Sequence, residues 1–451
     1  MYDFAVIGGG PGGYRTAELL CKDGFSVVLF EENNLGGTCL NEGCIPFKSY
    51  LHAARIKTDI EKLMKRKCVS EADIMINHNQ VFENKETIVK GIRQSIENTL
   101  NRLGINVFEE RAILKSASDE KFTFLVGDSE VVSKKIVIAT GAEDALNINK
   151  IREETKYTLI NSHRMLELNT VPKSIDIIGG GAIGLEAADY FFSSGSEVTV
   201  IEATSKIGGG IDGEISDTFQ TILRKKGVNI ITDTFLDDFE YDKVIFQQAN
   251  GCIFREPDCV MISAGRKPKI DYEMMKVLGV DYNDNGIIID DFCITSNPNI
   301  YACGDVTGKM MSAYVAYHQA KVIADYEKGI KKRTNYDMIP KVVYCNPEIL
   351  SVGLSEDACK ARGIKYEAMS LPMTYSGRYF ADNWKDGAKA KMLVDEEKRI
   401  VGFHMIANGA SEIALAAEMM ILQHMTCDEI CDLIYPHPTY GEIVYELAKL
   451  I

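Results

Sequence analysis

The chain has 451 residues, enough for two to four domains with an ample hydrophobic core. Hydrophobic residues make up 46% and charged residues 25%, as in an ordinary soluble globular protein. The formal net charge of −15 argues against nucleic acid as a partner, because lysine and arginine are needed to neutralise phosphates.

The sequence also lacks the signals for a membrane or secreted protein. No run of about 18 apolar residues occurs, and an apolar strand begins at Tyr2, which leaves no room for a signal peptide. Most of the 12 cysteines are scattered singly, as is typical of reduced intracellular thiols. We therefore expect a cytoplasmic protein, or one of the mitochondrial matrix if a transit peptide was removed. Cys427 and Cys431 lie in a probable helix without a partner at ligand spacing, so we expect packing residues and no metal site.

The first predicted unit, residues 2–31, has the order strand, glycine-rich loop, helix, strand. Its G-x-G-x-x-G motif consists of Gly8, Gly10 and Gly13. These glycines permit a tight turn and a close approach of a pyrophosphate to the N-terminus of a helix expected over 14–22. Glu31 ends the second strand, where it can accept hydrogen bonds from ribose hydroxyls. The unit therefore predicts dinucleotide binding.

Cys39 and Cys44 follow this unit, with four residues between them. Such a loop can bring the two Cα atoms to the roughly 4.4–6.8 Å that a disulfide requires. Gly36-Gly37 before the pair and Pro46 after it indicate a specially shaped backbone. A labile disulfide beside a flavin site would be a redox reagent. The alternative is a pair of buried structural cysteines.

A second unit of the same kind occupies residues 174–202. Its glycines are Gly179, Gly181 and Gly184. Two such units predict two dinucleotides, one that stores electrons and one that carries hydride away. Glu202 ends this unit without a following arginine, and a carboxylate there would repel a 2′-phosphate, which favours NAD over NADP. Lys206 is the one residue that could complicate this preference.

Three further strands end in small-residue turns. They lie near 135–141, 259–265 and 295–305, and their turns contain Thr140-Gly141, Gly265 and Gly304-Asp305. From about residue 335 the composition changes and no cofactor signature follows. This region is expected to contain a strand near 342–348, a charged hairpin turn at 395–399 and helices over 411–423 and 440–449.

His437 is the candidate base of the chain, in the motif His-Pro-Thr-x-x-Glu that ends at Glu442. Imidazole has an ordinary pKa of about 6.5 and can move protons at neutral pH, and a carboxylate can orient it and stabilise its charged form. The same residues also describe the start of a helix with a capping box. Both interpretations can hold together.

These motifs, in this order, resemble those of the flavin-dependent disulfide oxidoreductases over nearly the whole chain. The ending Cys44-Ile45-Pro46-x-Lys48 looks most like the dihydrolipoamide dehydrogenases. The resemblance implies an α/β fold with two Rossmann-like domains, for FAD and NAD, and a C-terminal α+β dimerisation domain. The implied divisions are 1–141 for FAD, 142–265 for NAD, 266–337 completing the FAD domain, and 338–451 for dimerisation.

The resemblance also implies roles for individual residues. Cys44 would face the flavin and Cys39 would exchange with substrate, with His437 as base and Glu442 as its partner. Lys48 and Glu186 would meet beside the reactive flavin nitrogen. FAD would be bound by Gly8, Gly10, Gly13, Glu31, Lys48, Thr140, Gly141 and Asp305, the last on the ribityl chain. NAD would be bound by Gly179, Gly181, Gly184, Glu202 and Gly265.

The implied reaction is oxidation of protein-bound dihydrolipoamide with NAD⁺ in a homodimer. The partner protein would be a lipoyl domain of a 2-oxo acid dehydrogenase acyltransferase or the glycine cleavage carrier protein. The alternatives are another disulfide reductase, similar to glutathione reductase, and a non-catalytic FAD/NAD redox sensor. Phe47, Glu42 and Tyr435 depart from the family pattern and leave the substrate contacts open. Ala182 lies where glutathione reductases carry a gating tyrosine, which favours the lipoamide branch.

Overall fold

The computed structural model describes residues 1–118, 120–148, 151 and 154–451. Its contacts divide the chain into two compact units, each assembled from separate stretches of sequence. The first unit comprises Met1–Ser49, Phe82–Leu146 and Gly265–Tyr336. The second unit comprises Tyr50–Val81, Asn147–Ala264 and Asp337–Ile451, without the undescribed positions 149–150 and 152–153.

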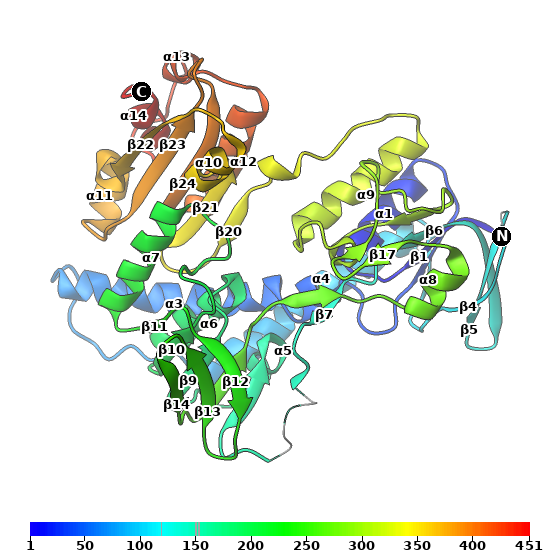
Figure 1. The fold of residues 1–451 in the computed structure, drawn as a ribbon, viewed down its shortest axis with the longest axis horizontal. Helices are drawn as coiled ribbons and strands as arrows, with labels where there is room; N and C mark the ends of the chain where they lie inside the picture. The colour runs from blue at the N-terminus through cyan, green and yellow to red at the C-terminus, as the bar shows by residue number, and fades with distance from the viewer. Residues whose placement is uncertain (119, 149–150, 152–153) are drawn as a thin grey trace. The chain divides into compact units, whose positions relative to one another are not determined.

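A mixed sheet is the centre of the first unit (Figure 1). Its strands are β1 (Tyr2–Ile7), β2 (Val27–Phe30), β3 (Asn106–Phe108), β4 (Ile113–Ala117), β5 (Phe122–Val126), β6 (Ser129–Ile138) and β19 (Ile300–Ala302). The order is β3-β2-β1-β6-β5-β4, and β19 also pairs with β6. β3, β2, β1, β6 and β19 run parallel, and β5 and β4 continue from β6 as antiparallel hairpins. The central parallel strands are apolar runs because both of their faces are buried.

The helices of the first unit include α1, which directly follows β1. The elements are α1 (Pro11–Lys22), α2 (Gly37–Asn41), α8 (Tyr272–Leu278), α9 (Ala313–Glu327) and the short 3-10 turn η2 (Asp305–Thr307). Two small ribbons join β7 (Ala142–Asp144) to β16 (Arg266–Pro268) and β17 (Tyr282–Asn283) to β18 (Gly286–Ile287). Helices α3 (Cys44–Lys65) and α4 (His78–Arg102) contribute residues to both units. Helix α1 begins at Pro11 rather than at residue 14, because proline suits the first helical turn.

The second unit contains a five-stranded parallel sheet in the order β11-β10-β9-β15-β8. Its strands are β8 (Thr158–Asn161), β9 (Ser174–Ile178), β10 (Glu197–Ile201), β11 (Asn229–Ile231) and β15 (Cys259–Ile262). Its helices are α5 (Ser162–Met165), α6 (Ala182–Ser193) and α7 (Gly213–Lys226). An antiparallel meander is formed by β12 (Phe235–Phe239), β13 (Val244–Gln248) and β14 (Gly251–Arg255). The succession β9-α6-β10 repeats the succession β1-α1-β2 of the first unit, as the two glycine motifs predict.

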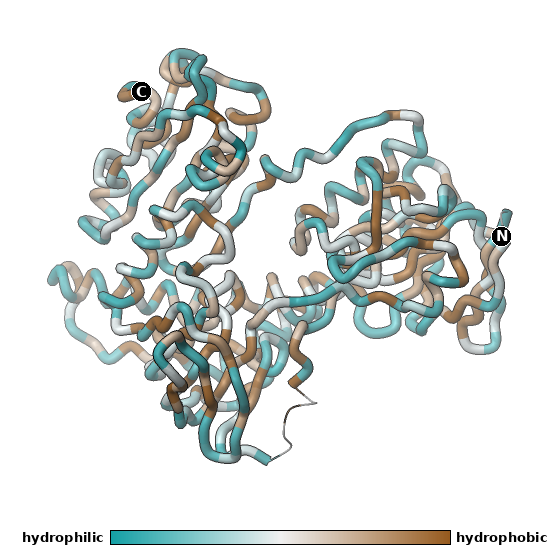
Figure 2. The backbone as a smooth tube through the Cα atoms, in the orientation of Figure 1, coloured by the Kyte–Doolittle hydropathy of each residue, from teal (hydrophilic) through white to brown (hydrophobic). Residues whose placement is uncertain are grey.

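The C-terminal part of the second unit is an antiparallel sheet with helices. The sheet has the order β20-β21-β24-β23-β22. Its strands are β20 (Lys341–Val343), β21 (Glu348–Gly353), β22 (Glu367–Pro372), β23 (Lys389–Val394) and β24 (Ile400–Ala407). The helices are α10 (Glu356–Arg362), α11 (Gly377–Asn383), α12 (Ala410–Leu422), α13 (Cys427–Cys431) and α14 (Glu442–Ala448). Figure 2 shows apolar stretches of the chain gathered inside the layers and hydrophilic stretches along the outer loops.

Two expectations for this part, the hairpin turn and the packing of the cysteines, are confirmed. The charged hairpin turn lies between β23 and β24, where Asp395 accepts hydrogen bonds from the backbone N–H groups of Glu397 and Arg399. Cys427 and Cys431 pack with the apolar core of the C-terminal sheet, as predicted. No cluster of metal-binding side chains occurs among the described residues. Among all the helices that the structure describes, none combines the length and apolarity needed to cross a bilayer.

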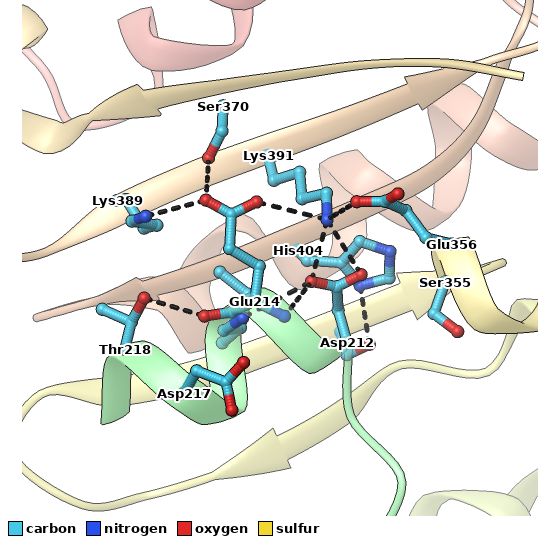
Figure 3. A network of polar contacts seen from close by, with 12 residues as sticks. Asp212, Glu214, Asp217, Thr218, Ser355, Glu356, Ser370, Lys389, Lys391 and His404 are labelled. Carbon is cyan, nitrogen blue, oxygen red and sulfur yellow. Dashed lines mark hydrogen bonds and ion pairs between the residues drawn. The ribbon is translucent and has the colours of Figure 1, made fainter. Parts of the chain in front are cut away.

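A buried lysine connects α7 to the C-terminal sheet (Figure 3). The ammonium of Lys391 lies 3.1 Å from Asp212, 2.5 Å from Glu356 and 3.3 Å from Glu214. Asp212 is also the N-cap of α7 and is almost fully buried. Burial lowers the pKa of the neighbouring His404, whose Nε2 donates to the carbonyl of Leu354 and whose Nδ1 accepts a hydrogen bond from the hydroxyl of Ser351. The charge of Lys391 is therefore balanced by carboxylates rather than by water.

We expect Lys391→Met to lower the free energy of unfolding by about 3–5 kcal/mol, because it leaves a buried carboxylate without its counter-ion. Lys389→Met is the matched control, since Lys389 pairs with Glu214 at the surface and should cost at most about 1 kcal/mol. Urea denaturation of both variants measures the difference. Hydrogen bonding to Lys391 holds the pKa of the Glu356 carboxyl at about 2, below its ordinary 4.5. This ion pair therefore stabilises the fold fully above pH 4.5, and the stabilisation is lost as the pH falls towards 2. Equal, small losses for both variants would contradict the prediction.

Candidate functional site

The loop after β1 has the backbone geometry of a pyrophosphate cradle. A Cβ on Gly13 would lie 1.7 Å from the Gly8 carbonyl oxygen, so only glycine lets α1 start this close to the strand. At Gly10 a Cβ would meet only the Cα of Gly37, at 3.8 Å, which leaves room at the helix N-terminus. The free N–H groups and positive dipole end of the helix face that room. The residues present therefore fit a dinucleotide here.

The loop after β9 repeats this geometry. A Cβ on Gly184 would lie 2.0 Å from the Gly179 carbonyl oxygen, whereas one on Gly181 would meet nothing within 4 Å. The tight contact and the open position thus fall at equivalent glycines of the two motifs. Gly265 follows the neighbouring strand β15 with a φ of 102°, a conformation that favours glycine. A second dinucleotide fits at this loop for the same reasons.

The glutamate that ends each dinucleotide-binding unit accepts hydrogen bonds from the glycine-rich loop of the same unit. Glu31 accepts hydrogen bonds from the N–H groups of Gly9 at 2.6 Å and Asn33 at 2.8 Å, and it is only 8% exposed. Glu202 accepts from the N–H groups of Gly180 and Thr204, both at 2.8 Å. A carboxylate has about four acceptor positions. Each acid therefore keeps capacity for a ribose hydroxyl.

Lys206 is engaged with another side chain. Its ammonium lies 3.2 Å from a carboxylate oxygen of Asp217. The one cation that could complicate the cofactor preference is therefore paired with a carboxylate at the surface.

Asp305 lies at the start of η2, directly after β19. Burial raises the pKa of its carboxyl, and the charge of Arg266 opposes that shift. In the described part of the chain no side-chain hydrogen bond reaches this carboxylate, which suits a residue that receives ligand hydroxyls. Nearby, the turn at Thr140-Gly141 is anchored to Lys269 by hydrogen bonds of 2.7 and 2.9 Å.

The cysteine pair is brought together in the first unit. Cys39 lies within α2, and Cys44 is the first residue of α3. Both are present as thiols, Cys39 half-buried and Cys44 exposed. The hydrogen bond between the two thiols, together with burial, raises the pKa of Cys39, while the charge of Lys48 lowers it. Cys39 therefore needs an external base if it is to exchange as a thiolate at neutral pH.

His437 and Glu442 form a hydrogen-bonded pair in the second unit. His437 Nδ1 lies 2.7 Å from Glu442 Oε1, and the other carboxylate oxygen accepts the N–H of Thr439 at 2.6 Å. These two hydrogen bonds lower the pKa of Glu442. A carboxylate partner at Nδ1 fixes the proton there and leaves Nε2 with its lone pair. The histidine side chain is 77% exposed, so Nε2 can reach an incoming molecule.

The capping-box interpretation of these residues holds only in part, since Glu442 accepts the backbone N–H of Thr439 but the Thr439 hydroxyl does not cap the helix. Helix α14 begins at Glu442 rather than near residue 440, and no side chain caps its first turn. The hydroxyl of Thr439 donates instead to the carbonyl of Pro436, at 3.0 Å. Glu442 is therefore the first helical residue, and its carboxylate serves His437 and the loop before the helix.

Lys48 and Glu186 fall in different units, and their pairing stays a prediction. Lys48 lies one helical turn after Cys44 in α3. Glu186 is buried in α6 and accepts the backbone N–H of Tyr344 at 3.1 Å. The assignment of His437 to the cysteine pair likewise stays a prediction, because it also joins the two units.

Two features near the cysteines carried no clear signal in the sequence. The hydroxyls of Tyr14 and Tyr317 are hydrogen-bonded to each other, and burial is the main cause that raises the pKa of both, with a smaller contribution from the nearby Cys39. Asn41, between the cysteines, receives a hydrogen bond from Arg93. The position of Tyr14 directly after the glycine motif could have identified it, but Tyr317 and Arg93 lie far away in the sequence.

Comparison with known proteins agrees with this geometry. The family described as pyridine nucleotide-disulphide oxidoreductase matches residues 2–320, and its dimerisation domain matches residues 339–448. Dihydrolipoyl dehydrogenase of Chlamydia trachomatis is 32% identical over 454 residues, which cover 100% of this chain and 96% of that protein. Dihydrolipoamide dehydrogenase of Chaetomium thermophilum is 33% identical over 461 residues, covering 99% and 90%.

Solved structures show the same fold. The HOCl-induced flavoprotein disulfide reductase RclA from Escherichia coli has a TM-score of 0.85 and 27% identity, and 100% of each chain is covered. LpdA from Mycobacterium tuberculosis has a TM-score of 0.89 at 19% identity, covering 99% of each chain, a likeness of fold alone. The predicted α/β architecture with a C-terminal dimerisation domain is confirmed.

Proposed function

This chain belongs to the pyridine nucleotide-disulphide oxidoreductase family and is a flavoprotein disulfide oxidoreductase, and from that premise we propose that it oxidises protein-bound dihydrolipoamide to lipoamide with NAD⁺. The observation that carries the proposal is the contact between the thiols of Cys39 and Cys44. Full-length similarity to dihydrolipoyl dehydrogenases supports this substrate over glutathione. A non-catalytic redox sensor could use the thiol pair alone and would have no need for the His437–Glu442 pair beside it.

The thiol chemistry is an exchange between the oxidised pair and the dithiol. One substrate thiolate attacks Cys39 Sγ, the Cys39–Cys44 bond breaks, and its electron pair stays on Cys44. His437 Nε2 takes the proton of the second substrate thiol, whose sulfur attacks the substrate sulfur held by Cys39. The substrate disulfide forms, and Cys39 leaves with the electron pair and takes the proton from His437. The substrate is oxidised, and the cysteine pair is reduced.

The family implies FAD and a nicotinamide cofactor. Bound FAD supplies the electron store between the cysteine pair and the nicotinamide. Its proposed ligands are Gly8, Gly10, Gly13, Glu31, Lys48, Thr140, Gly141 and Asp305. The proposed NAD ligands are Gly179, Gly181, Gly184, Glu202 and Gly265. We assign FAD to the domain formed by residues 1–141 and 266–337, and NAD to the domain formed by residues 142–265.

The dimerisation domain supports a homodimer. Helix α12 exposes Leu415, Met419 and Leu422, which lie on one helical face, and an exposed apolar face of this kind favours self-association. Within this dimer we propose that His437 of each subunit serves the cysteine pair of its partner. The other proposed partners are lipoyl domains of an acyltransferase or of the glycine cleavage carrier protein. The compartment we propose is the cytoplasm, or the mitochondrial matrix if a transit peptide is removed.

A steady-state assay tests both the substrate and the cofactor. Dihydrolipoamide with NAD⁺ should turn over, whereas oxidised glutathione with NADPH should not. The kcat/KM for NAD⁺ should exceed that for NADP⁺ by about 100-fold or more, because like charges in a binding site cost several kcal/mol. Glu202→Gln should reduce this preference, and Lys206→Met should leave it unchanged. Comparable values for the two cofactors in the unmodified protein would refute the NAD assignment.

A further inference from the structure

Helix α2, which carries Cys39, is too short to hold its own geometry. It contains five residues, Gly37–Asn41. Isolated helices shorter than about 12 residues are marginal in water, because fixing the first turn costs more than its hydrogen bonds return. Contacts from outside the helix must therefore set the position of the Cys39 thiol.

The start of α2 is held by the first glycine-rich loop. The N–H of Gly36 donates to the carbonyl of Gly9 at 2.9 Å. A Cβ on Gly37 would lie only 2.7 Å from the Cα of Gly10, so the two backbones are in direct contact. This end of the helix is thus attached to the loop proposed to hold FAD.

The end of α2 is held by the side chain of Asn41. Its amide nitrogen donates to the carbonyl of Gly37 at 2.9 Å and to those of Leu35 and Asn34 at 3.2 Å. An amide group has two N–H donors, so three acceptors engage both of them. The side chain therefore ties the last residue of the helix to its first residue and to the turn that precedes it.

Arg93 fixes the orientation of that amide. Its guanidinium reaches from α4 and donates to Asn41 Oδ1 at 2.5 Å. A guanidinium accepts no hydrogen bonds, so this contact selects the amide oxygen and directs the amide nitrogen towards the three carbonyls. Hydrogen bonds from a charged donor are stronger than those between neutral groups. Cys39 thus lies between two anchored ends of one short helix.

We propose that Arg93, acting through Asn41, is a positioning residue that sets the reduction potential of the Cys39–Cys44 pair. This inference rests on the proposed redox role of the pair. Closing a disulfide within one loop depends on the effective concentration of one thiol at the other, and a fixed thiol keeps that concentration high. Loosening α2 lowers it, which favours the dithiol and makes the pair easier to reduce.

The test compares Arg93→Met with the unmodified holoenzyme in buffers of reduced and oxidised dithiothreitol. The fraction of oxidised pair is measured by acid quenching, alkylation and mass spectrometry. We expect the exchange equilibrium to move about tenfold towards the dithiol, which is about 30 mV for a two-electron couple. Arg102→Met is the matched control, because Arg102 is an exposed residue at the end of the same helix. It should leave the potential unchanged, and Arg93→Lys should give an intermediate value.

A double-mutant cycle separates positioning from a general effect of charge. Asn41→Ala should shift the potential in the same direction, and adding Arg93→Met to it should have little further effect. Additive shifts, or equal shifts in the Arg93 and Arg102 variants, would overturn the inference. If the unmodified protein forms no Cys39–Cys44 disulfide at all, the proposed function fails and the inference fails with it. A disulfide whose potential is the same in Arg93→Met overturns the inference alone.

Discussion

Cys39→Ser is expected to abolish the oxidation of dihydrolipoamide, lowering turnover by a factor of about 10⁴ or more, as removal of a covalent nucleophile does. The substrate sulfur has no other thiol positioned for exchange, because Cys44 is then without its partner. Transfer of electrons from NADH to an artificial acceptor bypasses the thiols and should persist. Parallel assays of the two activities on the purified variant measure this separation.

Cys44→Ser should abolish the same activity but differ in its absorption spectrum. We expect Cys39→Ser to show a long-wavelength band from a Cys44 thiolate beside the flavin, and Cys44→Ser to lack it. Cys68→Ser is the matched control, because Cys68 is an exposed cysteine. It should change neither activity. The opposite spectral pattern would mean that the roles of Cys39 and Cys44 are reversed.

His437→Gln should lower dihydrolipoamide turnover by about 10²–10⁴-fold, the range typical of a lost general base. The hydrogen bond to Glu442 directs the Nδ1 proton inward and leaves Nε2 exposed as the base. Glutamine cannot take up a proton in this pH range. The transfer of electrons from NADH to an artificial acceptor, the flavin content and the melting temperature should barely move. Glu442→Gln should have a smaller effect, because it keeps the imidazole but removes its charged partner.

His424→Gln is the control for this prediction, since His424 is an exposed histidine of the same unit. Joint loss of both activities and of thermal stability in His437→Gln would show that the histidine is structural. Mixing the Cys39→Ser and His437→Gln proteins under subunit exchange should restore part of the activity, because a mixed dimer contains one complete site. A fully active monomer would exclude a base supplied by the partner.

The dinucleotide units could be predicted from the sequence because their chemistry is local. The contact that requires glycine at Gly13 is made with Gly8, and Glu31 bonds to the same loop. The cysteine pair and the His437–Glu442 pair are also close in sequence, so spacing alone places their side chains near each other. The helix boundaries were less accurate, since they depend on proline at the start of α1 and on the loop before α14.

Contacts between distant segments were decided only by the tertiary structure. Arg93 is 52 residues from Asn41, and Lys391 is 179 residues from Asp212. Neither lysine nor arginine has a local pattern that predicts burial or a partner, because the partner is chosen by how sheets and helices pack. Short-range spacing thus determined which chemical groups this protein carries. Packing decided which side chain orients α2 and which cation compensates the buried carboxylate at the start of α7.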